Sequence, residues 1–85
     1  MMHNTPNTEV RMFGSLHTIR RKRGLDPRVE MYVLPEGISG YALAHELDLP
    51  ADKIDRVFIN NTACSLDELI RPGDKVAFLS PWRPI

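Results

Sequence analysis

The residues best suited to chemistry in this 85-residue chain are three histidines and one cysteine, His3, His17, His45 and Cys64. Their spacing matches no zinc-binding pattern, because a structural zinc site needs four clustered nitrogen or sulfur ligands. They also form no recognisable pairing of a nucleophile with a general base. The sequence therefore predicts that the protein is not an enzyme, with no catalytic residue, no metal ligand and no bound cofactor.

The other polar residues are predicted to lie on the surface. Cys64 is expected to be a buried or half-buried, unreactive thiol, the usual state of a free cysteine. The neighbouring carboxylates Asp67 and Glu68, and the pair Asp52 and Asp55, are interpreted as surface charge. The five glycines are separated along the chain, so they form no phosphate-binding loop.

Charge is balanced overall but unevenly distributed. Residues 1–28 carry six Lys/Arg and two Asp/Glu, whereas residues 29–85 carry five and nine. A basic edge at Arg20–Arg23 and an acidic edge at 46–55 are expected, either as solvated surfaces or as features that orient a partner protein. The zero net charge argues against general attraction to nucleic acid or anionic membranes. Nucleic-acid binding through Arg20–Arg23 would also need interleaved aromatic residues, which are missing.

One small domain is expected at this length. No apolar run has the length of a membrane span, and the first ten residues lack the apolar core of a secretory signal. We expect a cytoplasmic protein, with residues 1–8 flexible, residues 9–81 folded and residues 82–85 forming a tail. The single cysteine cannot form an internal disulfide.

Alternating apolar and polar residues predict strands near residues 9–13, 28–34, 55–60 and 75–79. A helix near 40–48 is predicted by its apolar spacing, by a Ser39 cap and by Pro50, which ends it. Five residues on these elements are predicted to form the core: Leu43, Leu47, Ile59, Val76 and Phe78. The pattern of elements indicates an α+β fold.

The remaining segments are shorter. Residues 16–22 have helical spacing but leave a turn and a short helix as alternatives. Asn60-Asn61 predicts a tight hairpin turn, because asparagine tolerates the left-handed conformation. A short strand at 62–65 is expected after it. A single helical turn is predicted over 66–70, and a turn over 71–74.

Several of these segments resemble the ubiquitin-like sulfur carriers of the MoaD/ThiS family, which serve molybdopterin and thiamine biosynthesis. The resemblance rests on the LPEG run at 34–37, on Ile59-Asn60-Asn61, on Leu66 and Leu69, on Pro72-Gly73-Asp74, on Val76 and on Ser80-Pro81. It implies a ubiquitin-like β-grasp fold, a mixed four- to five-stranded sheet with one main helix packed across one face. It also implies that the last strand lies centrally, parallel to the first.

The resembled carriers end in Gly-Gly, which is adenylated and converted to a thiocarboxylate. This sequence ends in Trp82-Arg83-Pro84-Ile85, so no residue corresponds to the thiocarboxylate position. Trp82 is expected either to cover the end of the core or to anchor a partner. The candidate partner-docking residues are Phe58, Phe78, Pro81, Trp82, Arg83 and Ile85.

The resemblance implies a non-catalytic protein-interaction module. Its partner protein would contact the sheet face and the C-terminal tail, and neither nucleic acid nor a membrane is expected as a partner. Two alternatives remain open at this point. One is an active sulfur carrier with an atypical C-terminus. The other is a regulatory module like the TGS domains of GTPases and synthetases.

Overall fold

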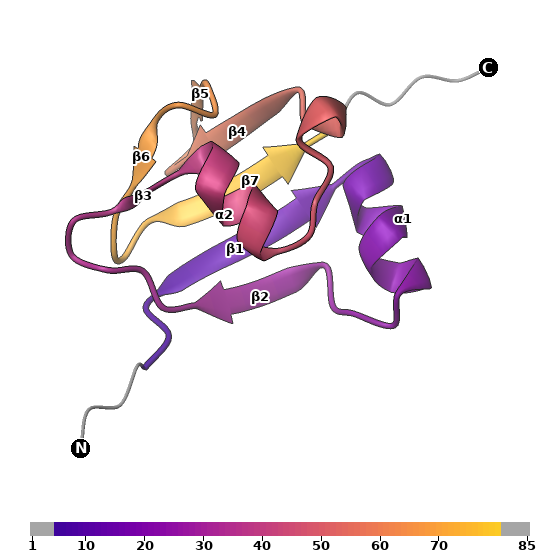
Figure 1. The fold of residues 1–85 in the computed structure, drawn as a ribbon, viewed down its shortest axis with the longest axis horizontal. Coiled ribbons are helices and arrows are strands. Elements are labelled where there is room, and N and C mark those ends of the chain that lie inside the picture. Colours follow the sequence, from indigo (N-terminus) through magenta and orange to yellow (C-terminus); the bar gives the residue numbers. More distant parts are fainter. Residues whose placement is uncertain (1–4, 81–85) are drawn as a thin grey trace.

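The computed structural model describes residues 5–80, which form an α+β structure with a mixed five-stranded sheet (Figure 1). The elements in chain order are β1 (Thr8–Phe13), α1 (Ser15–Lys22), β2 (Arg28–Met31), β3 (Ile38–Ser39), α2 (Gly40–Glu46), a 3-10 turn (Ala51–Lys53), β4 (Arg56–Ile59), β5 (Thr62–Cys64), β6 (Leu69–Ile70) and β7 (Lys75–Leu79). No helix within residues 5–80 has the length and apolar character needed to cross a membrane.

The five strands follow the order β2-β1-β7-β4-β5. β1 and β7 are the parallel pair at the centre of the sheet, whereas β2 pairs antiparallel with β1 and β4 pairs antiparallel with both β7 and β5. β3 and β6 form a separate two-stranded sheet. The first and last described strands therefore lie side by side, as predicted.

Period-two alternation decides which side chains enter the core. In β1 and β7, Val10, Met12, Val76 and Phe78 are buried, while the residues between them point to the opposite face. All of the core predictions are confirmed except Ile59, which is partly buried and packs against the core. The core therefore lies between one face of the sheet and α2.

Helix α2 begins as expected from the sequence. The Ser39 hydroxyl accepts a hydrogen bond from the backbone N–H of Ala42 at 3.1 Å, which caps the first turn. Leu43 and Ala44 are buried against the sheet, and the helix ends before Leu47. Asp48 then takes a left-handed conformation with φ 54°, ahead of Pro50.

The ambiguous segment after β1 is helical, as α1. Three basic residues, Arg20, Arg21 and Lys22, occupy its last turn, where the helix dipole favours positive charge. Arg20 is nevertheless only 6% exposed, and its Nε donates to the Asp26 carbonyl at 3.0 Å. The predicted basic edge is therefore corrected: it loses Arg20.

The predicted helical turn over 66–70 is wrong in its second half: residues 65–68 form one turn, closed by the Glu68 N–H donating to the Ser65 carbonyl at 3.1 Å, but residues 69–70 are a strand. The backbone carbonyls of Leu66 and Glu68 accept hydrogen bonds from the N–H groups of Tyr41 and Gly40, at 3.0 and 3.2 Å. Residues 69–70 then pair with β3 as strand β6. The turn therefore does not continue as a helix, because the start of α2 binds these carbonyls and residues 69–70 are extended against β3.

The start of the chain differs from the predicted flexible segment. β1 begins at Thr8, and the Asn7 side chain bonds both backbone groups of Val33: its Oδ1 accepts from the N–H at 3.0 Å and its Nδ2 donates to the carbonyl at 3.1 Å. The predicted strand 28–34 ends at Met31, and Asn7 holds its continuation at Val33. Residues 1–4 lie outside the described part.

Candidate functional site

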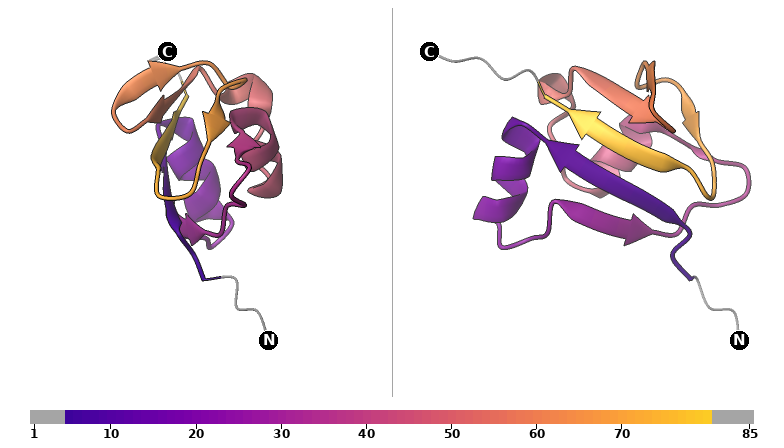
Figure 2. Two further views of the ribbon diagram at one scale, coloured as in Figure 1. Left: turned by 90° about the vertical axis from the view of Figure 1, so that its left-hand side faces the viewer. Right: turned by 180° about the vertical axis from the view of Figure 1, so that it is seen from behind.

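The candidate site is the face of the five-stranded sheet opposite the core. In the right-hand view of Figure 2, which shows the molecule from behind, β1 and β7 lie in front and α2 lies on the far side of the sheet. Within residues 5–80, no helix covers this second face, which we call the open face. Residues on the outward positions of β1, β7 and β4 are therefore accessible there.

Three large apolar side chains occupy the open face. Phe13 at the end of β1 is 45% exposed, while Phe58 on β4 and Leu79 on β7 are half-buried. They line a shallow depression of about 600 Å³, together with the charged residues Glu9, Arg11 and Lys75. The site is thus an apolar centre with a charged margin.

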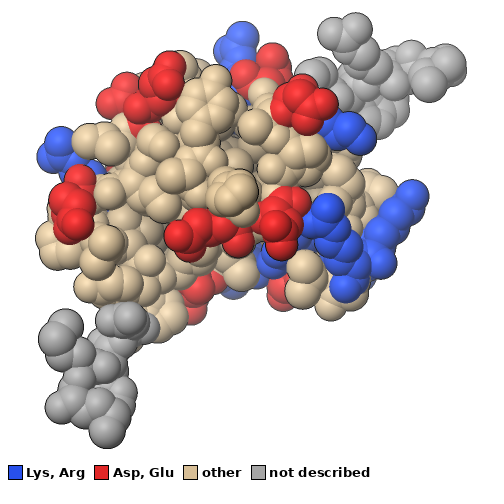
Figure 3. Space-filling view, viewed as in Figure 1, with Lys and Arg blue, Asp and Glu red and all other residues tan. Residues whose placement is uncertain are grey.

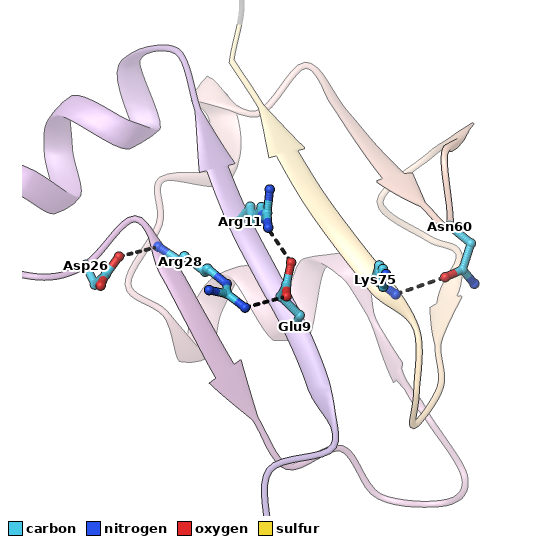
Figure 4. A network of polar contacts seen from close by, with 6 residues as sticks. All are labelled: Glu9, Arg11, Asp26, Arg28, Asn60 and Lys75. Carbon is cyan, nitrogen blue, oxygen red and sulfur yellow. Dashed lines mark hydrogen bonds and ion pairs between the residues drawn. The ribbon is translucent and has the colours of Figure 1, made fainter.

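The charged margin is ordered by one carboxylate (Figure 4). The Glu9 carboxylate accepts from Arg11 Nε at 2.7 Å and from an Arg28 guanidinium nitrogen at 3.0 Å. The hydrogen bond from Arg28 is the main cause that lowers the pKa of Glu9 below its ordinary value, and Arg11 adds to it. Glu9 is therefore held as an anion that fixes two arginines over β1 and β2.

The opposite margin is built by the hairpin between β4 and β5. Asn60 and Asn61 both have left-handed backbones, with φ 51° and 69°, which confirms the predicted tight turn. Asn60 Oδ1 accepts from the Lys75 N–H at 3.0 Å, and its Nδ2 donates to Asp74 Oδ1 at 2.9 Å. This side chain therefore ties the hairpin to the turn that precedes β7 (Figure 4).

The predicted docking residues do not form one surface in the structure. Phe58 lies on the open face, but Phe78 has 0% exposure and belongs to the core, so we remove it from the candidate docking surface. The other predicted docking residues, at 81–83 and 85, lie outside the described part of the chain.

Sequence reasoning missed Phe13 and Leu79 as parts of this surface. A signal for Phe13 was present, because it shares strand parity with Arg11 and not with the buried Val10 and Met12. Parity also distinguishes Leu79 from Phe78 on β7. The alternation within each strand, applied consistently, therefore selects the apolar residues of the open face.

The residues with chemical potential lie apart from one another. His17 and His45 are exposed on α1 and α2, while Cys64 on β5 is half-buried and donates through its thiol to the Thr62 carbonyl at 3.3 Å. Residues 5–80 contain no group of three or more His, Cys, Asp or Glu side chains placed to hold a metal ion.

No protein-family model matches this chain, and a search of curated proteins finds no significant match.

Proposed function

We propose that this protein is a ubiquitin-like β-grasp module that binds a partner protein through the open face of its sheet. The observation that carries the proposal is the cluster of Phe13, Phe58 and Leu79 on a face that no described helix covers. Burying the accessible apolar side chains of a sheet against a partner lowers the free energy, because it removes their surface from water.

The β-grasp part of the proposal is supported by the topology. The order β2-β1-β7-β4-β5, with a central parallel pair and α2 across one face, is the layout that the resemblance to MoaD/ThiS sulfur carriers implies. The residues that carry the resemblance also occupy fitting places. Asn60-Asn61 forms the β4–β5 hairpin, and Gly73 takes φ 91° in the turn before β7.

The chemistry of the open face fits a protein partner. Aromatic side chains at the centre of an interface contribute most of its binding energy, and charges at the rim set orientation more than affinity. Phe58 supplies an aromatic centre, while Glu9, Arg11 and Lys75 supply a rim of both signs. Such a surface binds by contact and needs no catalytic residue.

A titration of the ¹⁵N-labelled protein tests this proposal. The ligands are the two classes of partner that sulfur carriers use, an adenylating activating enzyme and the large subunit of molybdopterin synthase, both from the host organism. We expect signal changes centred on Phe13, Phe58 and Leu79. Phe58→Asp is expected to weaken binding at least about tenfold, because it places a charge in the apolar centre.

Tyr41→Asp is the matched control, because Tyr41 is an exposed aromatic residue on α2, across the sheet from the open face. It is expected to leave binding unchanged. Failure of both enzymes to bind would overturn the proposed relationship to sulfur carriers. Equal effects of Phe58→Asp and Tyr41→Asp would overturn the open face as the site.

A further inference from the structure

A second surface lies along the free edge of β2. This strand comes first in the sheet order, so within residues 5–80 it has a neighbour, β1, on one side only (Figure 1). A strand at a sheet edge presents backbone donors and acceptors that another chain can pair with.

The hydrogen bonds to β1 identify the outward groups. The carbonyls of Pro27 and Met31 accept from the N–H groups of Met12 and Asn7, both at 2.9 Å. Val33 is held on the same side by the Asn7 side chain. Because backbone groups alternate in an antiparallel pair, those of the residues between, Glu30 and Tyr32, point away from β1.

Asn7 therefore extends the accessible edge beyond the end of β2. Its amide pairs with Val33 as a neighbouring strand would, and it keeps the backbone from Met31 to Val33 close to the sheet. Arg28, by contrast, is partly occupied, because its N–H donates to Asp26 Oδ1 at 2.9 Å. The free stretch of the edge is centred on Glu30 and Tyr32.

An apolar depression lies beside this edge, between the segment after β2 and helix α2. It has a volume of about 150 Å³ and is lined in part by Tyr32, Leu34, Ile38 and Leu43. Leu34 is 51% exposed and Tyr32 38%, so the rim of the depression is open to solvent. A single apolar side chain of an added strand fits a space of this kind.

Around this edge the one basic residue of β2, Arg28, is already paired with Glu9 at 3.0 Å, whereas three glutamates have no such partner. Glu30 on β2, Glu36 in the following turn and Glu46 on α2 are exposed, and no ion pair joins any of them to a lysine or arginine within residues 5–80. Figure 3 shows both acidic and basic side chains on the face of the molecule that carries α2, with a group of basic ones gathered toward one end. A ligand of this edge is therefore favoured when it carries positive charge.

We propose that the free edge of β2 binds an extended, basic segment of a partner protein by strand addition. The backbone of the segment pairs with Glu30 and Tyr32. One of its apolar side chains enters the depression beside Leu34, and flanking lysine or arginine side chains lie near the glutamates. The Glu30 side chain lies opposite Glu9 and points to the open face, but the backbone edge and the depression beside Leu34 do not include Phe13, Phe58 or Leu79, so the inference does not rest on the proposed function.

A blocked peptide of sequence KKVIVIKK tests the inference with the full-length ¹⁵N-labelled protein. We expect saturable signal changes at Glu30, Tyr32 and Leu34, and slower exchange of the Glu30 and Tyr32 amide protons in the complex. The same peptide with alternate backbone amides N-methylated on its pairing edge should bind at least about tenfold more weakly, because strand addition depends on those groups.

A charge-reversed peptide, EEVIVIEE, should also bind at least about tenfold more weakly at low salt. Leu34→Asp is expected to abolish the response to KKVIVIKK, and Leu69→Asp, at an exposed leucine on β6, is the matched control that should retain it. Both leucines are exposed, so neither variant empties the core.

Four results with the peptides would overturn the proposal, and a fifth concerns the protein alone. They are no saturable binding of KKVIVIKK, equal binding of the N-methylated peptide, equal binding of EEVIVIEE, and signal changes centred on Phe58 instead of Glu30. A dimer that protects the Glu30 amide without peptide would instead assign the edge to a second copy of this chain, and would also overturn the proposed occupant.

Discussion

The Ser80 hydroxyl accepts a hydrogen bond from the backbone N–H of Ser15 at 2.7 Å, across 65 positions of the chain. Ser15 begins α1, and the preceding residue, Gly14, has φ 68° and no side chain to serve as a cap. Ser80, the residue that follows β7, therefore supplies the acceptor that the helix lacks locally. This joins α1 to the central parallel pair of strands.

Ser80→Ala is expected to destabilise the protein by about 1 kcal/mol, the usual cost of removing a helix cap. It leaves the Ser15 N–H without its acceptor and also removes the bond between the two hydroxyls at 2.8 Å. Urea unfolding measures the change. Ser65→Ala, at an exposed serine before the 66–70 segment, is the control and should be nearly neutral. Equal free energies of unfolding for Ser80→Ala and wild type would contradict the capping role.

Gly40→Ala is expected to destabilise the protein by about 1–3 kcal/mol, the typical cost of overpacking. Helix propensity alone predicts the opposite, since alanine is favoured over glycine by about 1 kcal/mol inside a helix. A Cβ at position 40 would lie 2.9 Å from the Leu66 carbonyl oxygen and 3.1 Å from its Cα, both backbone atoms. Close packing therefore outweighs propensity here.

Thermal or urea unfolding of Gly40→Ala measures this effect. Tyr41→Ala, at the next residue of α2, is the control, because Tyr41 is exposed and alanine favours a helix. A stabilised Gly40→Ala protein would show that the 66–70 segment moves away from α2 without cost.

The two asparagines of the hairpin are expected to respond differently to glycine. Asn61→Gly should preserve stability or raise it by a few tenths of a kcal/mol, because glycine adopts φ 69° without strain. Asn60→Gly should be the more damaging change by about 1 kcal/mol, since it removes the bonds to Lys75 and Asp74. Equal effects in urea unfolding would show that the Asn60 side chain contributes nothing.

Local pattern was sufficient to predict the main strands and α2. Ser39 and Pro50 mark a helix whose apolar residues, Leu43 and Ala44, lie on one side, and the structure keeps these boundaries closely. The central position of the last strand came from resemblance, because period-two alternation alone does not tell which strands pair. Strand pairing depends on contacts between distant parts of the chain.

The errors have the same physical origin. Leu66, Leu69 and Ile70 have helical spacing, but the segment is too short for spacing to distinguish a helical turn from a strand. The N–H groups of Gly40 and Tyr41, at the start of α2, donate to carbonyls of this segment and keep it from continuing as a helix. Likewise, the sequence predicts a flexible segment that includes Asn7. That prediction misses the bonds from Asn7 to Val33, because they span 26 positions and leave no local signal.

Glu9→Gln is expected to lower stability at neutral pH and to have less effect in acid. Because Arg28, and then Arg11, lower the pKa of Glu9 in the folded protein, the carboxylate form is the one that folding favours. Its contribution is fully present above the ordinary glutamate value of about 4.3, and it is lost as pH falls through the lowered folded value. The difference between wild type and variant should therefore shrink as pH decreases.

Urea midpoints of both proteins, measured from neutral pH down to about pH 3, check this expectation. Glu36→Gln is the control, because Glu36 is exposed and is in no ion pair among residues 5–80. The difference in urea midpoint between wild type and Glu36→Gln should therefore not vary with pH in this way.

NMR titration of the Glu9 carboxyl adds a finer comparison. Arg28→Gln should raise the pKa of Glu9 more than Arg11→Gln does, because the hydrogen bond from Arg28 is the larger cause. A larger rise with Arg11→Gln, or a midpoint difference constant with pH, would contradict the arrangement.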